Sequence, residues 1–371
     1  MSIYIKSMRI DCFRGIRGLA PENLNHVNII AGDNNSGKTG ILEAMLFLRD
    51  PKSFGNVLRV AQIRNRRFNF NSASVYENFI SLFPGNAAIP EISISAECEG
   101  GRVAFSLIGE KKIILLEPYD LNLHISKGRN RQYLGQYLDR PETDSFNGEL
   151  KYEILGEKGI NSVEFHAHSK TTGREVDKNN FLNMVYLSPV DHIFGNTFNS
   201  ILRNDSYKET CVNILRLFDP SILDILYLKN EYTGRPVEYI RHSELGNMPL
   251  STYGDGIKKV LALVNGTVKA ANGILMIDEL ETAIHSKYYS DIFRFIIKIC
   301  KQLQVQLFVT THSMETIDEL LAAQDYDLHD ADDVSVITFK KDFESGRTYS
   351  RVLSGRHVLS DREEFGFEVR L

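Results

Sequence analysis

The sequence lacks the features that mark membrane, secreted or broadly basic proteins. No apolar run approaches the length of a membrane span and the N-terminus has no signal-peptide core, so we expect a cytoplasmic protein with no membrane partner. The four cysteines lie far apart and match no C-x-x-C spacing, which favours reduced thiols over disulfides or zinc ligands. The net charge of -5 excludes a generally basic surface for nucleic acid, although a local basic face remains open.

The chain also has no internal repeat, no low-complexity segment and no long heptad stretch, which argues against a long coiled-coil arm. What it has is a β-rich stretch between two stretches in which strands and helices alternate. Apolar or alternating runs predict strands at 3–14, 27–31, 91–96, 103–107, 152–155, 162–165, 274–277, 306–309 and 334–339. Helical spacing of apolar residues predicts helices at 41–48, within 197–228 and at 288–302.

A complete G-x-x-x-x-G-K-[ST] phosphate loop follows the second predicted strand. It reads Gly32-Asp33-Asn34-Asn35-Ser36-Gly37-Lys38-Thr39 and leads into the helix that the motif requires. The glycines let backbone N–H groups turn toward phosphates, and the helix adds the positive end of its dipole. We expect Lys38 to contact the β- and γ-phosphates of a nucleoside triphosphate and Thr39 to bind Mg²⁺. The flanking strand and helix disfavour the alternative, a plain glycine-rich turn.

Two later strands end in residues suited to phosphate chemistry. Strand 274–277 ends at Asp278 and Glu279, at the edge where open α/β sheets bind ligands. Asp278 is suited to hold Mg²⁺ through water, and Glu279 to polarise an attacking water. Strand 306–309 leads to His312, which suits a sensor of the γ-phosphate. Taken alone, such a histidine is more often structural, but its spacing from the acid pair favours the functional interpretation.

A second stretch of small residues precedes a helix in the last third of the chain. Ser251, Tyr253, Gly254 and Gly256 lie in this stretch. Small residues at a helix N-terminus can bind an anion, although a flexible loop with a helix cap would explain them equally well. One chain has no evident use for two phosphate-binding helix starts unless the second serves the nucleotide of a neighbouring copy.

These motifs stand in a characteristic order. GDNNSGKT, LSTYGDGIKK, ILMIDELETAIH and TTHS follow an opening MRIDCFRGI. The set resembles the ABC-type ATPase heads of the RecF/SMC and OLD-like group, and within it is similar to the stand-alone ATPase subunits of bacterial anti-phage systems such as Septu and PARIS. The resemblance implies an α/β P-loop NTPase of ABC type with an antiparallel β subdomain and a helical subdomain. We expect neither a long coiled coil nor a Toprim domain.

The resemblance also implies a division of the chain into parts of one composite ATPase head. Residues 1–175 would form the N-terminal lobe with the phosphate loop and hairpins, 176–230 a helical subdomain, and 231–371 the C-terminal lobe with the remaining motifs. Two heads would dimerise head to tail around two ATP molecules and their Mg²⁺ ions. Each nucleotide would lie between the phosphate loop of one copy and the signature loop of the other, which is the stretch of small residues at 251–256.

Residue roles follow from the same resemblance. Glu279 would be the base, His312 the γ-phosphate switch, and 281–285 the loop that links the two sites. The usual signature is Leu-Ser-Gly-Gly-Gln, whereas this chain has Ser-Thr-Tyr-Gly-Asp-Gly, so both Ser251 and Tyr253 are candidates for the hydroxyl that meets the partner's nucleotide. Gln62 is the candidate for the glutamine loop.

The complete ATPase motifs stand without a recognisable effector domain, and together with the resemblance this implies a switch that regulates a separately encoded effector, such as a nuclease, in anti-phage defence. A RecF-like DNA-repair ATPase and a scaffold that holds ATP with little turnover remain alternatives. Two basic patches bear on this choice: Arg59, Arg64, Arg66 and Arg67 with Phe68 and Phe70, and Lys127, Arg129 and Arg131 with Tyr133. Each could bind nucleic acid, lie on a solvated face or dock an acidic partner.

Overall fold

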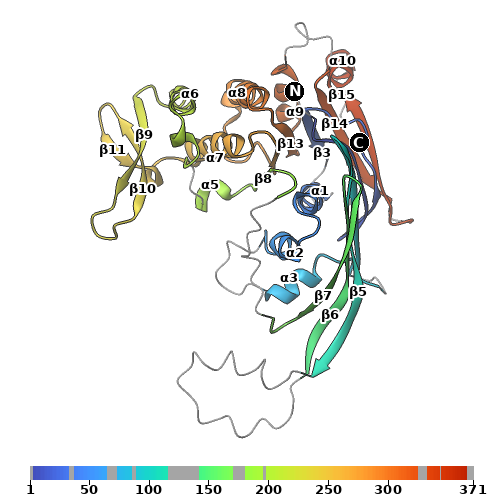
Figure 1. Ribbon diagram of the computed structural model, residues 1–371. Helices are drawn as coiled ribbons and strands as arrows, with labels where there is room; N and C mark the ends of the chain where they lie inside the picture. Colours follow the sequence, from blue (N-terminus) through green and yellow to red (C-terminus); the bar gives the residue numbers. More distant parts are fainter. Residues whose placement is uncertain are drawn as a thin grey trace, which may run out of the picture. The chain divides into compact units, whose positions relative to one another are not determined.

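The computed structural model describes residues 3–32, 37–64, 73–85, 89–115, 142–169, 180–194, 198–324, 332–342 and 344–365. The chain forms two compact units (Figure 1). The first unit comprises Met1–Met8, Leu19–Leu42 and Leu182–Leu371, and the second comprises Arg9–Gly18 and Glu43–Phe181. This division differs from the three ranges expected from the sequence, which stay a prediction.

A six-stranded sheet is the centre of the first unit. Its strands, in order, are β15 (Thr348–Ser354), β14 (Val334–Lys341), β3 (Val27–Ala31), β13 (Gln306–Thr311), β12 (Ile274–Ile277) and β8 (Met184–Leu187). All neighbours pair in parallel except β14 and β15. The four residues of β12 and all six of β13 are buried, which explains why these strands appear in the sequence as continuous apolar runs.

Helices cover this sheet and close the core of the first unit. They are α5 (Asp191–Phe194), α6 (Asp205–Leu215), α7 (Asp255–Lys269), α8 (Tyr289–Gln302), α9 (Met314–Ala322) and α10 (Gly355–Phe365), with short 3₁₀ turns η3 (Ile201–Arg203), η4 (Leu250–Thr252) and η5 (Ser286–Tyr288). Apolar side chains of α6 to α9 form one cluster with alternate residues of β3, β12, β13 and β14. The strands and the helix 288–302 expected in this part of the chain are therefore confirmed.

The helical expectation for 197–228 holds only in part. Helix α6 lies within that range, but Ile222–Lys229 is strand β9, paired with β10 (Pro236–His242), which in turn pairs with β11 (Gly246–Pro249). Pro220 stands before β9, and a proline interrupts the hydrogen bonding of a helix. The segment Ile-Leu-Asp-Ile-Leu-Tyr-Leu is also rich in residues that favour strands. The small sheet stands at one end of the first unit (Figure 1).

The second unit is built on a sheet of order β2-β1-β4-β5-β6-β7. The strands are β1 (Ile5–Phe13), β2 (Ile16–Leu19), β4 (Glu91–Cys98), β5 (Gly101–Leu115), β6 (Glu142–Ile154) and β7 (Glu157–His166), and β4 to β7 pair antiparallel in sequence order. Both expected hairpins are confirmed. The second turns at Leu155 and Gly156, earlier than the sequence indicated, so its strands are longer than expected.

One face of this sheet is covered by α2 (Phe54–Ala61) and α3 (Val75–Ile80), which follow the 3₁₀ turn η1 (Leu46–Arg49) (Figure 1). Strand β4 alternates buried and partly exposed side chains, as expected for a half-buried strand. Aromatic rings fill the space below the helices: Phe79 contacts Phe54, Phe146 and Phe165 at centroid distances of 5.1–5.6 Å. The expected antiparallel β subdomain is confirmed.

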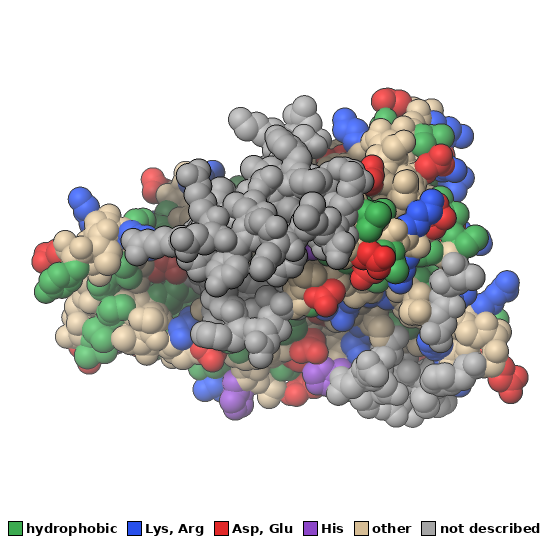
Figure 2. Space-filling model, turned by 90° about the horizontal axis from the view of Figure 1, so that it is seen from below, with side chains coloured by type: hydrophobic (Ala, Val, Ile, Leu, Met, Phe, Trp, Pro, Cys, Tyr) green, Lys and Arg blue, Asp and Glu red, His purple; other side chains and the backbone are tan. Residues whose placement is uncertain are grey.

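The described helices include none with the length and apolar character needed to span a membrane. Cys12, Cys98, Cys211 and Cys300 are free thiols, as expected. On the face drawn in Figure 2, Lys and Arg side chains lie among Asp and Glu side chains, so the described atoms of that face form no field of one sign.

Candidate ATPase site

The phosphate-loop region joins β3 to helix α1 (Lys38–Met45). Gly37 has φ +102°, a backbone conformation that a residue with a side chain rarely adopts, so the loop needs glycine at that position. The Lys38 side chain is buried, and its ammonium donates a hydrogen bond to the Gly32 carbonyl at 2.7 Å. The Lys38 side chain thus points back toward the first residue of the phosphate loop. Asp33, Asn34, Asn35 and Ser36 lie outside the described residues.

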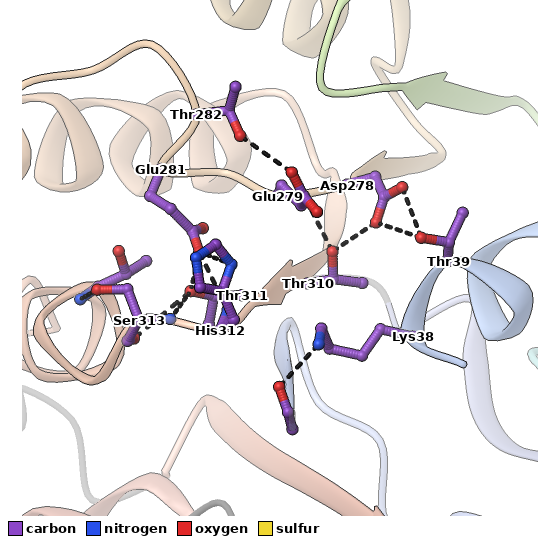
Figure 3. Close-up of polar contacts among 12 residues, drawn as sticks. Lys38, Thr39, Asp278, Glu279, Glu281, Thr282, Thr310, Thr311, His312 and Ser313 are labelled. Atoms are coloured by element: carbon purple, nitrogen blue, oxygen red, sulfur yellow. Dashed lines mark hydrogen bonds and ion pairs between the residues drawn. The ribbon is translucent and has the colours of Figure 1, made fainter. Parts of the chain in front are cut away.

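Three hydroxyl groups donate hydrogen bonds to the Asp278 carboxylate. Asp278 follows β12, is buried, and accepts hydrogen bonds from Thr39 at 2.9 and 3.1 Å, from Thr310 at 2.7 Å and from Tyr186 at 3.2 Å. Figure 3 shows Thr39 and Thr310 reaching its carboxylate from α1 and from β13. The two residues expected to hold Mg²⁺, which are distant in the sequence, therefore touch.

Glu279 is fixed by its backbone as well as by its side chain. Its φ of +47° lies in the left-handed region, which is strained for a residue other than glycine. The Glu279 amide donates to the Thr310 hydroxyl at 2.8 Å, and its carboxylate accepts a hydrogen bond from Thr282 at 3.2 Å (Figure 3). The Glu279 carbonyl accepts a hydrogen bond of 3.4 Å from Lys259. The loop therefore holds the carboxylate beside the Mg²⁺-binding candidate Asp278.

His312 is held by Glu281. The His312 Nδ1 lies 3.0 Å from Glu281 Oε1, and the same oxygen accepts the His312 amide at 3.0 Å and the Thr311 hydroxyl at 2.8 Å. Glu281 is buried, whereas the His312 side chain is 44% exposed. In Figure 3 the ring of His312 and the Glu281 carboxylate lie side by side at the end of β13. Glu281 thus fixes the orientation of the imidazole, which remains exposed to solvent.

The signature loop lies at the start of α7. Gly254 is the N-cap residue of this helix, and Ser251 and Gly254 are exposed while Gly256 is half-buried. The Tyr253 hydroxyl is buried and has no hydrogen-bond partner among the described residues, and its ring packs against the core. Tyr253 therefore faces inward, which favours Ser251 and the backbone at Gly254 and Gly256 as the groups that meet a ligand.

Three residues around this site escaped the sequence argument: Tyr186, Lys259 and Thr310. Thr310 lies on β13, and because Ile277 pairs with Val309, the next residues of the two segments, Asp278 and Thr310, stand side by side. The sequence does not contain this register. Lys259 lies in line with the apolar Leu263 one turn further along α7, a pattern that places it on a buried face. Tyr186 lies on β8, and no local pattern indicates which strand will neighbour β12.

The first basic patch is only partly described. Of its two described arginines, Arg64 is paired with a carboxylate. The Arg64 guanidinium makes two hydrogen bonds to Glu43, at 2.5 and 2.9 Å, and Arg14 lies 3.4 Å from the same carboxylate. Arg59 is half-buried, and Arg66 and Arg67 lie outside the described residues, as does the second patch at 127–133. Gln62 caps α2 in the second unit, and its role as the glutamine loop stays a prediction.

The donor set fits a nucleotide with Mg²⁺. Mg²⁺ prefers oxygen ligands, and the Thr39 hydroxyl and Asp278 carboxylate supply them at one place. A buried lysine and the N-terminus of α1 stand on the phosphate side of the same loop. Fold and site together define a P-loop ATPase of the ABC type, with the architecture of an SMC head and no long coiled coil in the described residues.

The chain belongs to the family described as "AAA domain, putative AbiEii toxin, Type IV TA system", whose model matches residues 27–318. It is similar to an "ATP/GTP phosphatase" of Helicobacter pylori, with 23% identity over 87% of this chain and 90% of that protein. It is also similar to the "Septu protein PtuA" of Bacillus thuringiensis, with 24% identity over 86% of this chain and 76% of that protein.

A solved structure confirms the fold. The SMC head crystallised with the C-terminal winged-helix domain of ScpA matches with a TM-score of 0.51 at 14% identity, covering 96% of this chain and all of that chain. The expected resemblance to SMC-type ATPase heads, and to the Septu ATPases within that group, is thereby confirmed.

Proposed function

We propose that this chain is an ATP-driven switch in which two copies close around two ATP molecules and so control a separately encoded effector, a nuclease, in anti-phage defence. One observation carries the proposal: in the first unit, the residues that would bind and hydrolyse ATP converge at one sheet edge, while the signature loop at the start of α7 is exposed (Figure 3). Such a loop is available to the nucleotide of a second copy.

Binding falls to the phosphate loop. Lys38 would exchange its hydrogen bond to the Gly32 carbonyl for the β- and γ-phosphates, while the first amides of α1 face the same anion. Thr39 and Asp278 would hold Mg²⁺, which when bound neutralises phosphate charge. The Thr310 and Tyr186 hydroxyls keep the Asp278 carboxylate aimed at Thr39. These contacts position the γ-phosphate before any chemistry.

Hydrolysis falls to Glu279 and His312. The Glu279 carboxylate would accept the proton of the attacking water as oxygen adds to the γ-phosphorus and the bond to the leaving ADP oxygen breaks. Thr282 and Thr310 hold that carboxylate and its backbone in place. His312, oriented by Glu281, would contact the γ-phosphate and register its loss.

The effector and the defence role are supported by the relatives. PtuA is a Septu protein, and the matched SMC head is bound to a domain of another protein. In this chain, β14 pairs with β3 and β15 with β14, so the segment after α9 completes the ATPase sheet. These strands therefore belong to the ATPase sheet of the first unit.

The test compares the wild type with Glu279→Gln, and with Glu315→Gln, an exposed carboxylate of α9, as the matched control. We expect the wild type and Glu315→Gln to release phosphate from ATP. Glu279→Gln should bind ATP, release no phosphate, and accumulate as a dimer in light scattering. Co-expression with the products of neighbouring genes should yield a complex with an effector. A chain that stays monomeric in every ATP-bound form and binds none of these products contradicts the proposal.

The same samples separate the alternatives. ATP-dependent binding to DNA with a steep salt dependence would instead support a RecF-like repair ATPase. Tight ATP binding without phosphate release in the wild type would support a scaffold. Neither outcome is expected, because the Glu279 carboxylate is held in place and Arg64 is already paired with Glu43.

A further inference from the structure

Lys259 is a buried cation in the helix that carries the signature loop. Its side chain is 2% exposed, and its ammonium donates a hydrogen bond to the Glu279 carbonyl at 3.4 Å. Burial lowers the pKa of Lys259 to about 8, although the nearby carboxylates of Glu281, Asp278 and Glu279 act in the opposite direction. A buried ammonium is costly unless anions compensate it. The segment 278–283 after β12, here called the acidic loop, therefore supplies the negative charges that compensate the ammonium of Lys259 on α7.

Glu281 is the strongest of these counter-charges and also the residue that holds His312. One oxygen, Oε1, faces Thr311 and His312, whereas the other, Oε2, is buried with no hydrogen-bond partner among the described residues. A buried carboxylate oxygen without a hydrogen bond needs electrostatic compensation. Lys259 interacts electrostatically with this carboxylate, and its ammonium is hydrogen-bonded two residues earlier, to the Glu279 carbonyl. Glu281 thus interacts both with the cation of α7 and with the histidine at the end of β13.

His192 is a further titratable group that interacts with Lys259. It is buried on α5, which packs against α7. Burial lowers the pKa of His192, and Lys259 acts in the same direction. His192 therefore stays neutral at pH 7, and Lys259 remains the cation that faces the acidic loop.

The acidic loop is shaped by contact with α7. Glu279 and Ala283 both have positive φ, +47° and +68°, so the surrounding structure must hold the loop in a strained form. Gly256, in the first turn of α7, approaches it so closely that a Cβ there would lie 3.2 Å from the Ala283 carbonyl. The helix thus touches the loop through Gly256 and, one turn later, through Lys259. Helix α7 is therefore in direct contact with the loop that carries Glu279 and Glu281.

We propose that Lys259 and Glu281 are positioning residues that couple the signature helix of each copy to Glu279 and His312 of its own site. Docking of the N-terminus of α7 on the partner's nucleotide then sets the geometry of the catalytic loop in the same chain. The two sites of the dimer then hydrolyse ATP cooperatively, because the geometry of each site depends on an α7 helix that contacts the nucleotide of the other site. The inference rests on the proposed composite ATPase and adds the route by which its halves communicate.

The experiment measures ATP affinity, turnover and cooperativity in the full-length chain carrying Lys259→Met, Lys259→Arg or Glu281→Gln. Methionine keeps the length and apolar packing of lysine but removes the charge, and arginine keeps the charge. Lys269→Met is the matched control, because Lys269 is exposed in the last turn of the same helix. A fluorescent ATP analogue reports Kd, phosphate release reports kcat, and the ATP dependence of turnover gives the Hill coefficient.

We expect Lys259→Met and Glu281→Gln to lower kcat by about tenfold or more and to bring the Hill coefficient to 1, with Kd changed by less than about twofold. Lys259→Arg should restore part of kcat, and Lys269→Met should match the wild type. Unchanged turnover in Lys259→Met overturns the proposal, as does a parallel loss of Kd, kcat and thermal midpoint. If Lys259→Met does not fold, full activity of Glu281→Gln overturns it. A wild type without turnover would instead refute the proposed ATPase function.

Discussion

Arg64→Ala separates a structural role for the first basic patch from a nucleic-acid role. Arg64 makes two charge-assisted hydrogen bonds to the Glu43 carboxylate, which is fully buried, while the Arg64 side chain itself is 50% exposed. Such hydrogen bonds contribute about 1.5–3 kcal/mol, and exposure of the guanidinium reduces the figure. Because Arg14 still lies 3.4 Å from Glu43, we expect Arg64→Ala to cost roughly 1–2 kcal/mol.

That loss should appear as a lower thermal midpoint. For a unit of this size, the midpoint should fall by roughly 3–6 °C. The chain has no tryptophan, so far-UV circular dichroism is the appropriate signal. Arg59→Ala is the matched control, since the Arg59 guanidinium makes no ion pair or hydrogen bond with another described residue. Its midpoint should stay within about 1 °C of the wild type.

Retention of DNA at low salt is measured on the same proteins. Arg64→Ala should retain as much or as little DNA as the wild type when the folded fractions are equal. An unchanged midpoint together with a clear loss of DNA binding would refute the structural assignment and restore the patch as a nucleic-acid site.

Three further outcomes follow from the site. Lys38→Ala should abolish ATP binding, measured with a fluorescent analogue, and lower the thermal midpoint only slightly, because the variant loses one hydrogen bond to the Gly32 carbonyl while the ammonium mainly serves a ligand; an insoluble variant counts against this. Asp278→Asn should remove the Mg²⁺ dependence of ATP binding in a magnesium titration, while a retained dependence would place the ion elsewhere. The folded-state pKa of Lys259, about 8, lies below the ordinary lysine value of 10.5, so the unfolded chain holds a proton that the folded chain lacks between these values. The stability of the wild type relative to Lys259→Met should therefore rise from pH 8 to 10.5, by roughly 3 kcal/mol in full, in urea titrations; a difference independent of pH would contradict the burial argument.

The parts of the site that local sequence patterns determine were predictable. The phosphate loop stands between an apolar strand and a helix, and Asp278 follows a strand of four apolar residues. Both patterns depend on neighbours within a few positions, and a parallel sheet then brings the strand ends to one edge. The contact between Thr39 and Asp278 is the physical result.

The remainder depended on contacts between distant segments. The apolar residues of β9 are too closely spaced to show the period of two that indicates a strand, so the sequence predicts a continuation of the helical pattern there. Arg64 was taken as a surface cation because nothing in its own segment indicates that Glu43, 21 positions earlier, lies buried beneath it. The group that pairs with Lys259 lies in the acidic loop, which packs on α7 and follows Lys259 by 20 residues. Burial of a charge is decided by the partner, which a local pattern does not contain.

The central claim is that each site is shared by two copies, and mixing two inactive variants tests it most directly. Lys38→Ala disables the phosphate loop. Gly254→Asp disables the signature loop by charge, since Gly254 is exposed at the N-cap with open space for a side chain, and aspartate is a favourable cap. A one-to-one mixture should recover phosphate release above that of either variant alone but below about one quarter of the wild-type rate. Half of the dimers are mixed and each carries one intact site, but the α7 helix of the chain that holds this site docks on no nucleotide. A mixture as inactive as either variant alone would contradict the account.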